Sequence, residues 1–264
     1  YCLQEGEILR LLKYYFDCHI EDGEAVIIGY SASLKLGIIT IPYSCIIYKK
    51  KSESLFQKQS LFRGNIRKVA RSSLWENIKL SFKGTWEGGI DTGAQELFFS
   101  KNGYIKWHCT NNGADVKINW NGKEYSGKGY AEYVDVTLPL WKLPFIKLKW
   151  GRWISDTDNE AVTWISWSGI KNENISRIWG ENYTENSEII YTDDEIRLGN
   201  RKIEIRNKKS IRDEIVSRSI LGRKDIFSFL LPKKLRNIDE KKYFSEGIMD
   251  GKKGKILYEE VIWK

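Results

Sequence analysis

The sequence predicts an all-β protein, and three observations lead to this fold class. Short runs rich in Ile, Val, Tyr and Trp recur along the 264 residues. Asn-Gly and Asp-Gly pairs separate many of these runs at intervals of about ten residues, which is typical of an antiparallel meander. Only two segments, 6–12 and 227–235, are candidates for short helices.

The first half of the chain divides into strands joined by turn signals. The runs 14–20 and 25–33 flank an Asp-Gly pair, and this arrangement is the strongest short signal for a hairpin. Further strands are predicted at 38–48, 75–86, 96–100, 104–110, 115–120 and 128–138, with turns at Asn102-Gly103, Asn111-Asn112-Gly113 and Asn121-Gly122.

The second half continues the same pattern. Its predicted strands are 147–155, 161–168, 175–179, 188–192, 195–198, 202–206, 214–221, 226–231, 241–249 and 255–264. Gly222 and Pro232 end two of these runs, because glycine and proline interrupt regular strands.

A weak internal repeat suggests two similar β domains. The segment 127–135 resembles 254–263, since each places an aromatic residue and carboxylates on a strand near the end of its half. We therefore predict one domain at 1–138, a Pro/Trp-rich connector at 139–144 and a second domain at 145–264.

Charge and cysteine content exclude several classes of partner and cofactor. The net charge is +8, but 43 basic and 35 acidic residues are interleaved, and the basic clusters are short. This predicts no specific nucleic-acid partner, although a polyanion binder with salt-dependent affinity stays an alternative. With two histidines and four cysteines that lack a CxxC spacing, no metal site is expected. The chain has no P-loop or dinucleotide-binding fingerprint, so no cofactor is expected either.

Hydropathy and the N-terminus bear on location. No stretch approaches 18 apolar residues and no signal peptide is visible, so we expect no membrane span and a cytoplasmic protein. The only Met is Met249, which leaves the natural start of the protein open. The oligomeric state is also open.

Three short motifs resemble a known family. They are Tyr15-Phe16-Asp17 followed by Glu21-Asp22-Gly23, then Gly127-Lys128-Gly129-Tyr130, and the tail Tyr258-Glu259-Glu260-Val261-Ile262-Trp263. They resemble segments of the hydroxyneurosporene synthase (carotenoid 1,2-hydratase) and AttH-like lipocalin-related family.

The resemblance implies two lipocalin-like antiparallel β-barrels, or sandwiches, packed side by side, with an apolar cavity. It also implies a class of enzymes that hydrate or cyclise isoprenoid or polyene substrates. The family carries His and Asp after Gly-Tyr, where this chain has Ala131 and Glu132.

Glu132 is the candidate proton donor. On a strand, Tyr130 and Glu132 share one face, and if this face is internal the carboxyl group is buried. Burial raises the pKa of a carboxyl group, and a neutral acid in an apolar pocket can protonate an alkene. Tyr130 and Arg152 would orient the substrate. Alternatively, Glu132 forms a structural ion pair, with Arg152 as the obvious partner, or faces solvent.

Aromatic residues at alternating strand positions indicate the lining of an apolar cavity. The candidate ligand-binding residues are Trp150, Trp164, Trp167, Tyr133, Tyr258 and Glu260, and Glu260 is a second candidate acid. The alternative is that these tryptophans and tyrosines only fill the core.

The sequence therefore predicts a protein that binds an apolar small molecule of isoprenoid or polyene type. Acid-assisted hydration or cyclisation of an alkene is the more specific hypothesis, which leaves open whether the protein is an enzyme. The alternatives are a non-catalytic lipid carrier and a carbohydrate-binding β protein with exposed tryptophans.

Overall fold

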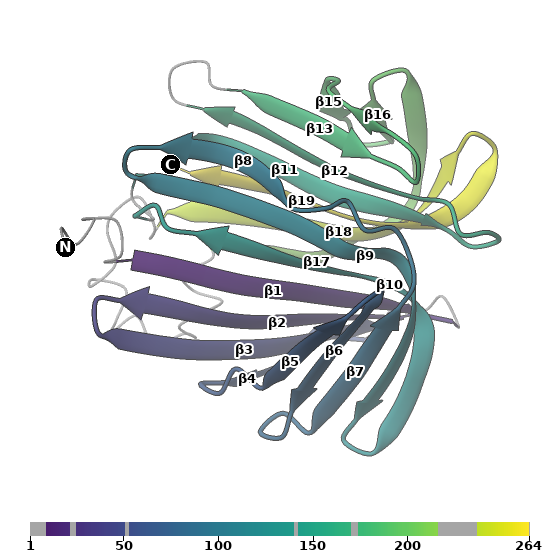
Figure 1. The fold of residues 1–264 in the computed structure, drawn as a ribbon. Coiled ribbons are helices and arrows are strands. Elements are labelled where there is room, and N and C mark those ends of the chain that lie inside the picture. The colour runs from purple at the N-terminus through teal and green to yellow at the C-terminus, as the bar shows by residue number, and fades with distance from the viewer. Residues whose placement is uncertain are drawn as a thin grey trace. The chain divides into compact units, whose positions relative to one another are not determined.

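The computed structural model describes residues 9–21, 25–50, 53–139, 142–169, 174–215 and 237–263, and within them it contains strands but no α-helix. These strands form two curved antiparallel sheets (Figure 1), which confirms the predicted all-β fold class. The predicted helix at 6–12 is wrong over its described part, because Leu9–Ile20 is the first strand, β1. The predicted helix at 227–235 lies outside the described residues.

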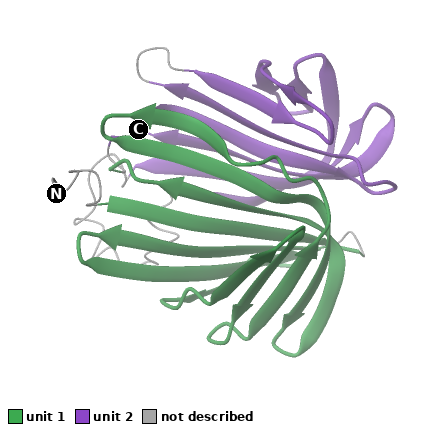
Figure 2. Ribbon diagram, in the orientation of Figure 1, with its two compact units in different colours: residues 1–139 green, residues 140–264 purple. Residues whose placement is uncertain are grey.

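The chain divides into two compact units. Unit 1 comprises residues 1–139 and unit 2 comprises residues 140–264 (Figure 2). Each sheet lies within one unit.

Unit 1 contains ten strands among its described residues. They are β1 (Leu9–Ile20), β2 (Ala25–Leu36), β3 (Ile39–Lys50), β4 (Phe56–Ser60), β5 (Asn65–Val69), β6 (Ser72–Asn77), β7 (Phe82–Glu87), β8 (Gln95–Ser100), β9 (Gly103–Trp120) and β10 (Lys123–Val136). Their order in the sheet is β4-β3-β2-β1-β10-β9-β7-β6-β5, and β8 pairs with β9. The first and last strands of the unit are therefore hydrogen-bonded to each other.

Two further predicted elements of unit 1 are wrong. The run 75–86 is a hairpin rather than one strand, because the side-chain oxygen of Asn77 accepts hydrogen bonds from the backbone of Lys79 and Leu80 and turns the chain. The predicted turn at 111–113 lies inside the continuous strand β9. There Asn111 is buried, and its side-chain amide donates to the carbonyl oxygens of Arg71 and Gly88, so it joins neighbouring segments.

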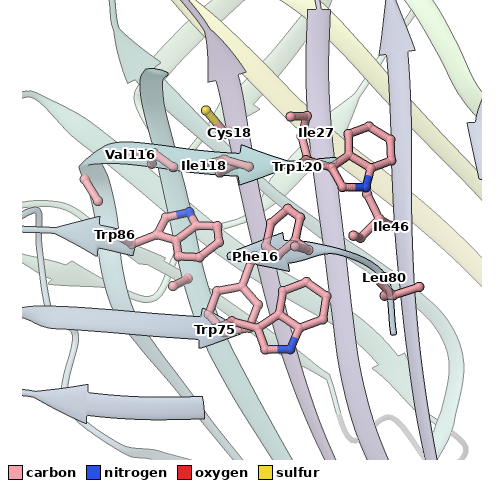
Figure 3. Close-up of a cluster of buried hydrophobic side chains, with 13 residues drawn as sticks. Phe16, Cys18, Ile27, Ile46, Trp75, Leu80, Trp86, Val116, Ile118 and Trp120 are labelled. Atoms are coloured by element: carbon pink, nitrogen blue, oxygen red, sulfur yellow. The ribbon is translucent and has the colours of Figure 1, made fainter. Parts of the chain in front are cut away.

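An aromatic cluster fills the core of unit 1 (Figure 3). The ring of Phe16 lies 5.5 Å from that of Trp75 and 4.6 Å from that of Trp86. The Trp86 indole N–H also donates to the carbonyl oxygen of Asp17 at 2.7 Å. Gly29 makes room for this cluster, since a Cβ atom there would lie 2.5 Å from the Trp75 ring. We call the sheet face that carries this cluster the inner face of unit 1.

Unit 2 contains nine strands among its described residues. They are β11 (Phe145–Ser155), β12 (Ala161–Gly169), β13 (Ile175–Trp179), β14 (Thr184–Glu185), β15 (Ile189–Tyr191), β16 (Glu195–Leu198), β17 (Arg201–Ile215), β18 (Ile238–Met249) and β19 (Lys252–Trp263). Their order is β14-β13-β12-β11-β19-β18-β17-β16-β15. The predicted strand 226–231 and the end of 214–221 lie outside the described residues.

The two units share one strand order. In each, the first strand pairs with the last, and β10 of unit 1 corresponds to β19 of unit 2. Both pairings need a glycine, because a side chain would collide with the backbone of the neighbouring strand. A Cβ atom at Gly127 would lie 1.8 Å from the carbonyl oxygen of His19, and one at Gly254 would lie 2.4 Å from that of Ile154. The similarity between 127–135 and 254–263 therefore has a topological counterpart.

The core of unit 2 is also rich in tryptophan. Trp153, Trp164 and Tyr258 pack with aliphatic residues on one face of the sheet, which we call the inner face of unit 2. Gly151 lies opposite Trp164, and a Cβ atom there would approach the indole ring to 2.4 Å.

Candidate functional site

Tyr130 and Glu132 lie on the face of the unit 1 sheet opposite the aromatic core. Ala131, between them, belongs to that core, and side chains alternate along β10. Tyr130 is fully buried, and Glu132 is 8% exposed. The two residues share a face, and this face points away from the interior of the curved sheet.

Two hydrogen bonds orient the Glu132 carboxyl group. The Tyr130 hydroxyl group donates to Oε2 at 2.6 Å, and the indole N–H of Trp107 donates to the same oxygen atom. Trp107 belongs to β9 and is 1% exposed. The phenol and the indole thus fix a buried carboxyl group in one orientation.

Tyr15 and Tyr130 flank this carboxyl group, and Tyr30 extends the aromatic row beyond Tyr15. Tyr15 on β1 lies directly across from Glu132 in the β1–β10 pairing. Its ring is 6.1 Å from the ring of Tyr130 and 5.3 Å from that of Tyr30 on β2. All three tyrosines are buried, so Glu132 has an aromatic environment.

The neighbouring thiol of Cys109 is unreactive. Burial first, and then the charge of Glu132, raise the pKa of Cys109 well above its usual value, although a hydrogen bond with Tyr130 opposes this. The group therefore stays a thiol at neutral pH and is a poor nucleophile. Trp107 and Cys109 were not predicted for the site, although strand alternation along β9 places both on one face.

Tyr133 lies on the other face of the sheet from Glu132. Its ring is 5.7 Å from the ring of Tyr14 and 5.3 Å from that of His108. Burial is the largest cause that raises the pKa of Tyr133. The predicted cavity lining of unit 1 is thus split between two faces.

Trp164 and Tyr258 come together on the inner face of unit 2. The Trp164 indole N–H donates to the Tyr191 hydroxyl group at 2.7 Å, and the ring of Tyr191 lies 5.4 Å from that of Tyr258. The Tyr258 hydroxyl group is buried and has no hydrogen-bond partner among the described residues. Burial is the largest cause that raises the pKa of Tyr258.

Glu260 lies near these aromatic side chains and forms an ion pair with a lysine. Its carboxylate forms an ion pair with Lys147 at 2.5 Å, and it lies opposite Lys149 in the β11–β19 pairing. Lys149 donates to the carbonyl oxygen of Ile189 at 3.1 Å, and burial followed by the charge of Lys147 lowers its pKa. Lys149 and Tyr191 were missed from the sequence, because nothing in the pattern linked β11 to β15.

Trp150, Arg152 and Trp167 lie on the opposite face of unit 2, and all three are buried. The Lys242 ammonium group lies 5.8 Å from the centre of the Trp150 ring. Arg152 belongs to unit 2 and Glu132 to unit 1, so their pairing stays a prediction.

The surface of unit 2 carries a depression of about 380 Å³ between its turns. It is lined by Asp158, Asn159, Glu160, Ala161, Val162, Gly180, Glu181, Asn182, Tyr183 and Lys252. None of the predicted site residues lines it, so the predicted apolar cavity remains a prediction.

The described residues hold neither a cluster of metal ligands nor a membrane-spanning helix. Within them, no group of three or more His, Cys, Asp or Glu side chains is arranged to hold a metal ion. Among these residues there is also no helix of sufficient length and hydrophobicity to cross a bilayer. Cys18, Cys45 and Cys109 are buried.

Comparison with known proteins gives similarity in structure but not in sequence. No protein-family model and no curated protein matches the chain. A crystal structure assigned as AttH from Nitrosomonas europaea is 10% identical, with a TM-score of 0.57, and the match covers 96% of this chain and 92% of that one.

Two further crystal structures match to the same extent. Kievitone hydratase from Nectria haematococca is 9% identical over 100% of this chain and 93% of its own, with a TM-score of 0.57. CghA with Sch210972 is 11% identical over 97% of this chain and 89% of its own, also with a TM-score of 0.57. The chain is therefore similar to these AttH-like proteins in its lipocalin-like, all-β fold.

Proposed function

We propose that this protein binds an apolar small molecule and that Glu132 protonates a carbon–carbon double bond in it. The observation that carries the proposal is the buried Glu132 carboxyl group, oriented by Tyr130 and Trp107 and bordered by tyrosine rings. A fixed acid in an aromatic, water-poor setting is what alkene protonation requires.

The chemistry is balanced with the groups of this chain and water. The carboxylic O–H bond breaks, a C–H bond forms from the alkene π electrons, and a carbocation results. The faces of Tyr15, Tyr30 and Tyr130 would stabilise this cation through their π electrons. Attack by water gives hydration, attack by a second double bond gives cyclisation, and in both cases a proton returns to Glu132.

The structural neighbours support the general class. One carries the name of a hydratase, and another was crystallised with Sch210972. Because these neighbours are only about ten per cent identical to this chain, they bear on its fold and not on its substrate. The substrate type, isoprenoid or polyene, is therefore part of the proposal.

A non-catalytic carrier is the second candidate, and one observation favours it. Both donors, from Tyr130 and Trp107, bind to a single oxygen atom of Glu132. Hydrogen bonds of this kind favour the ionised carboxylate, which cannot protonate an alkene. In that case Glu132 would bind a hydroxyl group of the ligand.

The tryptophans weigh against a carbohydrate-binding face. Nine of them are buried: Trp75, Trp86, Trp107, Trp120, Trp150, Trp153, Trp164, Trp167 and Trp179. An open glycan-binding surface needs exposed rings, whereas an apolar site encloses them. Trp141 lies outside the described residues.

The test begins with mass spectrometry of molecules that co-purify with the protein, followed by turnover measurements on the ligand identified. Glu132→Gln should keep binding but lose at least about 100-fold in turnover, the usual minimum for a general acid. Glu124→Gln, an exposed position on the same strand, is the matched control. Full turnover by Glu132→Gln would exclude the acid role. If the wild-type protein binds the ligand but does not turn it over, the non-catalytic carrier is the function that is supported. Failure to bind any apolar molecule would exclude both.

A further inference from the structure

A row of ring side chains crosses three neighbouring strands on the inner face of unit 1. His108 on β9 lies directly opposite Tyr133 on β10, and Tyr133 lies directly opposite Tyr14 on β1. The ring centres are 5.3 Å and 5.7 Å apart. All three residues are half-buried, so the row forms a shelf that solvent reaches.

Asp91 holds the imidazole ring at one end of this shelf. Its carboxylate is hydrogen-bonded to His108 Nε2, to the backbone N–H of Gly93 at 2.8 Å and to the Lys68 ammonium group at 3.0 Å. Burial alone would raise the pKa of Asp91, but these three hydrogen bonds lower it. The carboxylate of Asp91 accepts at Nε2, so the other ring nitrogen, Nδ1, is the one that can take up a proton from a bound molecule.

Arg63 bounds the other end of the shelf. Its guanidinium carbon lies 5.2 Å from the centre of the Tyr14 ring. The backbone carbonyl of Arg63 accepts hydrogen bonds from the Ser31 hydroxyl group at 2.8 Å and from the Trp75 indole at 3.1 Å, which fixes this loop. The Nε–H group of Arg63 is buried and has no hydrogen-bond partner among the described residues. A buried donor without a partner is rare, and an acceptor on a bound molecule would satisfy it.

We propose that this shelf binds a planar aromatic acid of the phenol type and that His108 accepts its proton. The phenolic O–H bond breaks, an N–H bond forms at Nδ1, and the imidazolium is stabilised by Asp91. The aromatic ring would stack on Tyr14 and Tyr133, and Arg63, at the other end of the row, would donate to an acceptor group on the far side of the ring, such as the nitro group of 4-nitrophenol. These residues lie on the opposite face of the sheet from Glu132, so the inference does not rest on the proposed function.

The test uses 4-nitrophenol, whose visible absorption arises only from its ionised form. At a pH below the pKa of the free probe, wild-type protein should bind it and increase this absorption. His108→Gln should reduce the ionised bound fraction by about tenfold, and Arg63→Gln should weaken binding by about tenfold, the effect of losing one charge-assisted hydrogen bond. Lys83→Gln, an exposed position on β7, is the control that should leave both unchanged.

Histidine NMR provides an independent measurement on the unaltered protein. The chain contains only His19 and His108, so the imidazole signals can be assigned with one variant. Adding 4-nitrophenol should shift the His108 signals and leave those of His19 in place. Asp91→Asn should keep the His108 ring but lower the ionised fraction. Three outcomes would each overturn the proposal. The wild-type protein could fail to bind the probe, the His108 signals could stay unshifted, or His108→Gln could bind 4-nitrophenol with the same ionised fraction as wild type.

Discussion

The Tyr130 hydroxyl group donates to Glu132 Oε2 across 2.6 Å, although the two residues are neighbours on one face of the same strand. Strand β10 is irregular here, since its register with β9 shifts between Gly129 and Tyr130 and again between Ala131 and Glu132. Such irregularities redirect side chains and are frequent beside functional sites. The local backbone thus contributes to the geometry of the proposed acid.

Removing this donor should destabilise the protein. Tyr130→Phe keeps the buried ring but leaves Glu132 with one donor fewer, so we expect the free energy of unfolding to fall by about 1–3 kcal/mol. Urea denaturation measures this change. Tyr125→Phe, at a half-buried tyrosine on the same strand, should change it by less than about 0.5 kcal/mol. Equal values for the two variants would show that the hydrogen bond to Glu132 is energetically unimportant.

A buried charge cluster in unit 2 should be sensitive to the loss of one member. The Lys242 side chain is 2% exposed and lies 2.5 Å from Glu259 and 3.5 Å from Glu240. Lys242→Met would leave the buried Glu240 carboxylate and the partly buried Glu259 carboxylate without this cation, and the expected loss of stability is about 3–5 kcal/mol. Lys202→Met removes an exposed lysine that pairs with Glu204 at 3.3 Å, and it should cost less than about 1 kcal/mol. The two variants are compared by thermal and urea unfolding, and a Lys242→Met protein as stable as Lys202→Met contradicts the expectation.

Acid should weaken unit 2 through Asp158. The hydrogen bond from Lys252, followed by those from the backbone of Glu160 and from Ser155, lowers the pKa of Asp158 to about 2 from 3.8. A lowered pKa in the folded state stabilises the protein above pH 3.8, and this contribution is lost as the pH falls towards about 2. Asp158→Asn should therefore be less stable than wild type near neutral pH, and the difference should shrink below about pH 4 and vanish near pH 2.

Urea denaturation at several pH values checks this dependence. Asp194→Asn, at an exposed aspartate of the same unit, is the comparison. A difference between Asp158→Asn and wild type that stays constant down to pH 2 would exclude Asp158 as the group responsible.

Strand content could be predicted from the sequence wherever apolar runs and turn residues agree. The runs 175–179 and 195–198 match β13 and β16, and the Asn121-Gly122 turn joins β9 to β10 with both residues at positive φ. The errors have a common cause. Asn111 and Asn112 look like a turn in isolation, but tertiary contacts bind the Asn111 side chain and the Asn112 backbone within a continuous strand.

The sequence also determined that Tyr130 and Glu132 share a face, because the strand period is two. It could not decide which face that is, and the structure places both opposite the aromatic core.

Trp107 beside Glu132, Lys149 beside Tyr191 and Asp91 beside His108 were likewise decided only by tertiary structure. Each pair joins residues that are distant in the chain or on different strands, and such contacts depend on sheet order and curvature. The amino-acid pattern fixes local conformation through short-range sterics and alternation, whereas long-range register depends on how the whole core packs.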